Sequence, residues 1–71
     1  MATVYPEQLL VNEFVQLNDT IMRTRSRPFV AKDTPPDHVT VKLKPIATWA
    51  RGRRSFTRRV HFWRGHRLVV I

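Results

Sequence analysis

Two short segments set the architecture that the sequence predicts, Trp49-Ala50-Arg51-Gly52-Arg53-Arg54 and Phe62-Trp63-Arg64-Gly65-His66-Arg67. Each has a tryptophan shortly before an Arg-Gly pair, and together they hold both glycines of the 71-residue chain. Glycine readily adopts the positive φ that tight β-hairpin turns require. We therefore predict hairpin turns at Arg51-Gly52 and Arg64-Gly65, each joining two antiparallel strands.

Strands are predicted on both sides of these turns. Residues 39–44 alternate between apolar and polar side chains, which is the pattern of a half-buried strand. A long strand over 53–63 and a last strand over 67–71 follow. Together they predict a three- or four-stranded antiparallel β-meander over 39–71, with a register that the turn lengths leave open.

Residues 6–23 have the periodicity of an amphipathic helix. Pro6 suits the first helical position, and Glu7 favours the positive end of the helix dipole. Apolar side chains then recur on one helical face, at Leu10, Phe14, Leu17 and Ile21. We expect this helix to pack on the meander or against a second copy of the chain.

Residues 24–38 connect the helix to the meander. Pro35 and Pro36 exclude a helix and disfavour a central strand. We expect a solvent-exposed loop there, with room for one short strand over 29–31. The sequence thus predicts a single small α+β domain over 1–71, with an N-terminal amphipathic helix packed on the meander.

Charge divides the chain into two unequal parts. Its 13 basic residues, ten of them arginine, outnumber the 5 acidic residues, for a formal charge of +8. Residues 1–22 carry −3 and residues 23–71 carry +11. Arginine presents a planar fork of donors that matches phosphate bidentately and stacks on bases. The balance therefore predicts a polyanionic partner, and we expect nucleic acid.

The predicted binding residues cluster in the second half of the chain, where aromatic side chains interleave with arginines. They are Arg51, Arg53, Arg54, Arg58, Arg59, Trp63, Arg64 and Arg67. A second basic patch, Arg23, Arg25 and Arg27, either extends this surface or caps the helix. The plainer interpretation of the cluster is a solvated basic surface without a ligand.

The two faces of the long strand have different predicted roles. The first carries Phe56, Val60 and Phe62, which we assign to the core. The opposite face carries Arg59, His61 and Trp63, but a slip of one residue would exchange the two faces. Trp63, or Trp49, would stack on a base if its face is open; alternatively both indoles pack beneath the helix.

Several other functions lack support in the sequence. It has no nucleophile–base pair, paired carboxylates or glycine-rich phosphate loop, so we expect no enzymatic activity. The spacing of His38, His61 and His66 fits no zinc motif, and without cysteine there is no thiolate site. We expect no metal and no cofactor. No apolar run approaches the roughly 20 residues of a membrane helix, and we expect a cytoplasmic protein.

Part of the chain resembles a small uncharacterised bacterial family with an extended Pro-Ile strand and an aromatic-Trp-Arg-Gly hairpin. The matching segments are Lys44-Pro45-Ile46, Phe62-Trp63-Arg64-Gly65 and Leu68-Val69-Val70. The resemblance covers less than half of the chain, and family members usually have one residue between the Phe and the Trp. It implies no functional residue. The predicted order of helix and strands is also similar to the start of double-stranded-RNA-binding domains, without their final helix.

We therefore expect a small basic protein that grips the phosphate backbone of DNA or RNA through its Arg-rich hairpins. Two alternatives remain: a structural subunit of a ribonucleoprotein, viral or organellar assembly, and a small regulator that binds an acidic protein. A homodimer could form through the helix or through an apolar C-terminal edge strand at 69–71.

Overall fold

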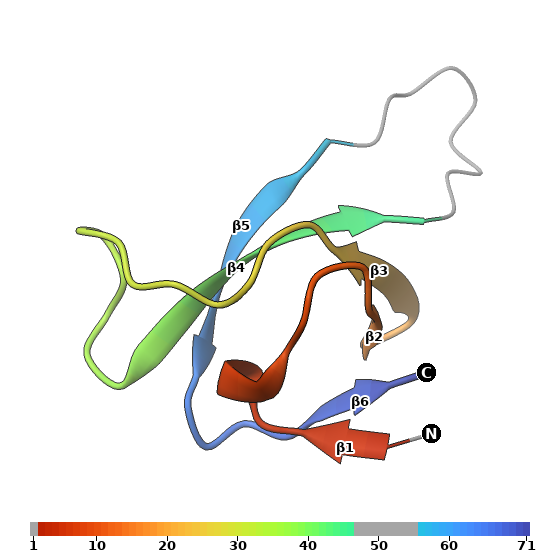
Figure 1. Cartoon of the computed structure of the whole chain (residues 1–71), viewed down its shortest axis with the longest axis horizontal. Helices are drawn as coiled ribbons and strands as arrows, with labels where there is room; N and C mark the ends of the chain where they lie inside the picture. Colours follow the sequence, from red (N-terminus) through yellow and green to blue (C-terminus); the bar gives the residue numbers. More distant parts are fainter. Residues whose placement is uncertain (1, 47–55) are drawn as a thin grey trace.

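The computed structural model describes residues 2–46 and 56–71. They form one six-stranded antiparallel sheet in the order β1-β6-β2-β3-β4-β5 (Figure 1). The elements are β1 (Ala2–Val4), the single 3-10 turn η1 (Pro6–Gln8), β2 (Phe14–Leu17), β3 (Thr20–Thr24), β4 (His38–Pro45), β5 (Arg58–Trp63) and β6 (Leu68–Val70).

The α+β prediction is wrong, because the segment expected to be an amphipathic helix forms η1 and the β2–β3 hairpin. Pro6 does take the first helical position, but the 3-10 turn ends at Gln8. Asn18 and Asp19 then form the two-residue loop of the hairpin, and Asn18 has a φ of 53°. Asparagine tolerates this left-handed conformation, so the chain reverses there instead of continuing as a helix.

The meander prediction is correct for one pair of strands and wrong for the other. β4 and β5 pair antiparallel, in a register that runs from His38↔Trp63 to Leu43↔Arg58. β6, in contrast, does not pair with β5 but lies between β1 and β2. The turn at Arg64-Gly65 exists, closed by a 2.9 Å hydrogen bond from His66 N to Trp63 O, but it joins strands that are not neighbours. The expected turn at Arg51-Gly52 lies outside the described residues.

The short connection between β5 and β6 requires the sheet to curl. In a flat sheet these strands would be four strand spacings apart, or about 19 Å. Residues 64–67 bridge this distance although they include a tight turn. The two ends of the sheet therefore approach each other, and β5 and β6 diverge from a common corner (Figure 1). The C-terminal strand β6 lies between β1 and β2, so it is not an edge strand, and the helix expected over 6–23 is not formed. Neither of the two dimer surfaces expected from the sequence therefore exists as predicted.

The core lies inside the curl of the sheet. It consists of Leu9, Val15, Met22, Val41, Leu43, Phe62 and Leu68. The predicted inward alternation of β4 is confirmed, since Val39, Val41 and Leu43 are all buried. Phe62 on β5 is buried as predicted. Phe56, which precedes β5, is 67% exposed and does not belong to the core.

A buried hydroxyl fastens the turn before β2 to the end of β3. Thr24 Oγ1 accepts a hydrogen bond of 2.8 Å from the backbone N–H of Glu13 and donates to the carbonyl of Leu10. The Thr24 side chain is fully buried, so both bonds form away from water. Such satisfied buried polar groups fix one local arrangement of the backbone.

The segment 24–38 is largely a solvent-exposed loop, as the sequence predicts, but hydrogen bonds hold it against the sheet. It runs beside β4 (Figure 1), where Arg25 N donates to Lys42 O over 2.7 Å. Phe29 and Thr40 exchange two backbone hydrogen bonds of 2.9 and 2.7 Å, so the expected short strand is reduced to one bridge. Thr34 Oγ1 also bonds the buried Thr40 Oγ1 over 2.7 Å. The segment therefore covers part of the sheet.

Candidate nucleic-acid interface

The side chains of each strand that point away from the core form what we call the outer face. On β4, these are the residues that alternate with Val39, Val41 and Leu43. Directly paired residues of an antiparallel sheet lie on the same side of it. The outer face therefore includes Arg23 on β3, Lys42 and Lys44 on β4, and Arg59 on β5.

Two pairs of like charges lie directly opposite each other on this face. Arg23 pairs with Lys44 across β3 and β4, and Lys42 pairs with Arg59 across β4 and β5. Opposed residues have Cβ atoms about 4.5–5.5 Å apart, and like charges at this distance destabilise a sheet. Within residues 2–46 and 56–71, no carboxylate forms an ion pair with Arg23, Lys42 or Lys44. We call these four residues the basic quartet.

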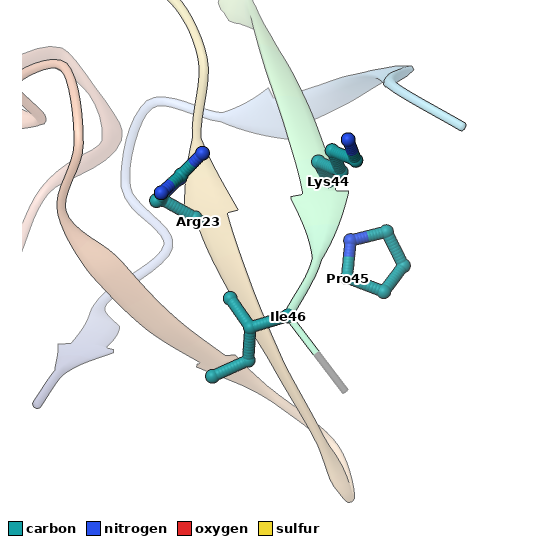
Figure 2. A pocket seen from close by; sticks show the side chains of 4 residues that line it. All are labelled: Arg23, Lys44, Pro45 and Ile46. Carbon is teal, nitrogen blue, oxygen red and sulfur yellow. The ribbon is translucent and has the colours of Figure 1, made fainter. Parts of the chain in front are cut away.

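A shallow hollow lies beside one pair of the quartet. It measures about 290 Å³ and is lined by Arg23, Lys44, Pro45 and Ile46. Figure 2 shows the Arg23 side chain from β3, the Lys44 side chain from β4, and Ile46 beside the pair. The volume is at the lower limit of small-molecule sites, about 300–1,000 Å³. The hollow therefore suits a small anionic group and not a large cofactor.

Arg59 differs from the other members of the quartet because it has an internal partner. Its Nη2 lies 2.5 Å from Oδ1 of Asp33, which the segment 24–38 brings over the outer face. The guanidinium carbon also lies 5.9 Å from the centre of the Phe29 ring. The second carboxylate oxygen of Asp33 is 3.7 Å from Nε2 of His61. One predicted binding arginine is thus already neutralised.

Two further predicted arginines turn toward the N-terminal segment. Arg64 Nη1 forms a 2.9 Å ion pair with Glu7 Oε2, and the Arg67 guanidinium lies 5.8 Å from the centre of the Tyr5 ring. The acidic start of the chain therefore contacts the basic β5–β6 turn. The acidic first part of the sequence and the basic second part are therefore in contact in the folded chain.

The remaining predicted residues are divided between several places. Arg58 is exposed on the edge strand β5, where a charge also discourages pairing with another chain. Arg25 and Arg27 are exposed in the segment after β3, and Arg23 joins the quartet instead of capping a helix. The residues that lie outside the described part of the chain are Trp49, Arg51, Arg53 and Arg54.

Trp63 occupies the outer face at one end of β5. It lies opposite His38 and is 58% exposed, so its face is open, which is the condition under which the sequence predicts that Trp63 could stack on a base. His61, two residues earlier, bonds the Thr40 hydroxyl through Nδ1 over 2.7 Å. Among the described residues, no three side chains gather as metal ligands.

Sequence reasoning did not place Lys42, Lys44 or Phe14 beside the arginines of the outer face. Lys42 and Lys44 were recognised only as the polar half of a strand, because their partners Arg59 and Arg23 depend on long-range pairing. Phe14 was assigned to a helix face, whereas it lies opposite Arg23 on the outer face. The alternation in 39–44 already placed the two lysines on one side of a strand, and that signal was available.

Comparison with protein-family models, with curated proteins and with solved structures found no match to this chain. The resemblance to the bacterial family therefore stays a prediction from the sequence. No helix in the described residues is long and apolar enough to cross a membrane.

Proposed function

We propose that this protein binds the phosphate backbone of nucleic acid with the outer face of its sheet. The observation that carries the proposal is the basic quartet: two adjacent like-charge pairs, three of whose four members have no carboxylate partner among the described residues. Opposed like charges cost stability in the free protein. An anion placed between them converts this repulsion into attraction.

Arginine and lysine suit this task in complementary ways. The Arg23 guanidinium can donate two parallel hydrogen bonds to one phosphate, and Lys44 adds a compact charge beside it. The hollow next to this pair has room for a small anionic group. The formal charge of +8 would steer a polyanion toward the protein from a distance.

The proposal changes the set of residues that the sequence predicted. Arg23, Lys42 and Lys44 are the primary phosphate contacts, with Arg59 available once Asp33 releases it. Arg64 and Arg67 are excluded from the set, because Glu7 and Tyr5 engage them on the N-terminal side. Contacts to phosphate position a ligand without selecting its bases, so we expect weak sequence preference.

The test is binding of labelled oligonucleotides at several salt concentrations. If three or four phosphates are neutralised, log affinity should fall with log salt at a slope of about −2 to −4. Arg23→Gln and Lys44→Gln should each weaken binding and reduce that slope by about one. Arg64→Gln removes the same charge from a residue ion-paired with Glu7 and is the matched control. A salt-independent affinity, or equal effects of all three variants, would contradict the proposal.

A second candidate is an acidic protein segment, and one observation favours it. The outer face already accepts a carboxylate, because Asp33 occupies Arg59. A competition experiment separates the two candidates. If the outer face binds an acidic protein segment, polyglutamate should compete for it as effectively as an oligonucleotide of equal charge does. Displacement by the oligonucleotide alone supports the nucleic-acid function.

A further inference from the structure

One row of the outer face places an aromatic ring next to the unpaired cations. Phe14 of β2 lies directly opposite Arg23 of β3, and Arg23 lies directly opposite Lys44 of β4. Since neighbouring strands are about 4.8 Å apart, the backbone of Phe14 stands one spacing from that of Arg23 and about 10 Å from that of Lys44. The row thus presents a flat apolar surface followed by two positive charges.

The Phe14 ring is not part of the core. It is 40% exposed and belongs to the outer face, whereas its neighbour Val15 points inward and is fully buried. Ile21 and Ile46 are also exposed, and a backbone hydrogen bond from Ile46 N to Ile21 O brings them together. Ile71 donates its backbone N–H to Phe14 O and is exposed as well. Single exposed apolar residues are ordinary, but several on neighbouring strands beside cations are typical of a binding surface.

We infer that this row binds an unpaired nucleotide, with its base on Phe14 and its phosphate at Arg23 and Lys44, so that the protein prefers single-stranded nucleic acid. The inference rests on the proposed function and names its substrate class. A nucleotide joins a flat base to a phosphate through one sugar, and the row offers these two surfaces in that order. In a duplex both faces of each base are covered by its neighbours, so only an unstacked base can reach the ring.

A second aromatic side chain extends the same surface. Trp63 lies opposite His38 on the outer face and is more than half exposed. His38 and Lys44 are six residues apart along β4, which corresponds to roughly 20 Å. Lys42 and Arg59 lie between the two aromatic positions. Thr40, between Lys42 and His38 on the same face of β4, is buried beneath the segment 24–38, so a single strand that reaches from the basic quartet to Trp63 passes over this segment.

The test compares a single-stranded oligonucleotide with a duplex of the same length and sequence. The proteins are the full chain, Phe14→Leu, Phe14→Tyr and Lys44→Gln, each checked for folding by circular dichroism. We expect the full chain to bind the single strand at least about 10-fold more tightly than the duplex. Phe14→Leu removes the ring on which one base stacks. This variant should therefore bind the single strand about 5- to 100-fold more weakly and bind the duplex unchanged.

The variants separate stacking from phosphate binding. Phe14→Tyr keeps an aromatic ring and should bind single strands nearly as tightly as the original protein does. This variant still tests the inference if Phe14→Leu fails to fold. Phe56→Leu makes the matched change at a phenylalanine that is exposed before β5, and should have no effect. Lys44→Gln should weaken binding of both nucleic acids.

Equal affinity for single strand and duplex, or an unchanged single-strand affinity in Phe14→Leu, would overturn the inference. An equal loss of single-strand affinity in Phe56→Leu would also overturn the inference, because the loss in Phe14→Leu would then not be specific to the row of Phe14, Arg23 and Lys44. In each case the phosphate-binding proposal survives if Lys44→Gln still weakens binding. If Lys44→Gln binds like the original protein, the proposed function itself fails.

Discussion

The indole of Trp63 lies where a side chain on Gly65 would begin. A Cβ atom on residue 65 would stand 2.5–2.8 Å from three carbons of the six-membered ring of Trp63. The indole therefore occupies the space of a side chain at residue 65, and the φ of Gly65 is outside the left-handed region. The sequence predicted a turn here, but as a hairpin that needs positive φ, whereas this turn joins strands that are not neighbours. Positive φ is found instead at Asn12, Asn18 and Asp37.

Gly65→Ala should force the indole away from the turn. Because the clashing atoms are the far end of an exposed side chain, we expect a modest loss of stability, about 1 kcal/mol, at the low end of overpacking effects. In a Trp63→Leu background the same substitution should cost clearly less. Urea unfolding of the four proteins of this cycle measures the coupling. Equal costs in both backgrounds would mean that the indole does not restrict residue 65.

Lys44→Gln should make the free protein more stable while it weakens nucleic-acid binding. The substitution removes the repulsion between Lys44 and Arg23, which lie directly opposite each other. We expect a gain of about 0.2–1 kcal/mol at low ionic strength, measured by thermal or urea unfolding. The gain should shrink in 1 M salt, where charges are screened within about 3 Å. A loss of stability at low salt would show that the pair is compensated.

Asp33→Asn should increase nucleic-acid affinity by a few-fold. The carboxylate of Asp33 occupies Arg59 in the free protein and so competes with an incoming phosphate. Both side chains are about half exposed, so the loss of stability should stay below about 1 kcal/mol. Asp19→Asn, in the β2–β3 turn, removes the same charge outside the quartet and is the control. If both variants bind equally, Asp33 acts only through net charge.

Local patterns were sufficient to predict β4 and part of its environment. The strict alternation in 39–44 identified the buried side of the strand, and that side is the one that packs on Phe62 and Leu68. The antiparallel partner of β4 was also predicted. These features follow from side-chain periodicity over a few residues, which does not depend on distant parts of the chain.

The helix prediction failed because one set of spacings fits two structures. Leu10, Phe14 and Ile21 fall on one helical face, yet all three are exposed in the folded chain. Two of the residues that are buried instead, Val15 and Met22, are partners across the β2–β3 hairpin. The pairing of β6 with β2, and of Arg23 with Lys44, depends on contacts between distant segments. No local pattern encodes such contacts, so the basic quartet could not be assembled from the sequence.

Substitutions at Asn18 distinguish the hairpin from the predicted helix by the sign of their effects. Asn18 has a φ of 53° in the two-residue loop of the hairpin, a conformation that alanine adopts at a cost of about 1–2 kcal/mol and glycine adopts freely. Asn18→Ala should therefore destabilise the protein, and Asn18→Gly should be neutral or stabilising. In a helix interior the order reverses, since alanine is the best helix former and glycine is about 1 kcal/mol worse. Urea unfolding of the two variants decides between the structures, and a more stable alanine variant would contradict the hairpin.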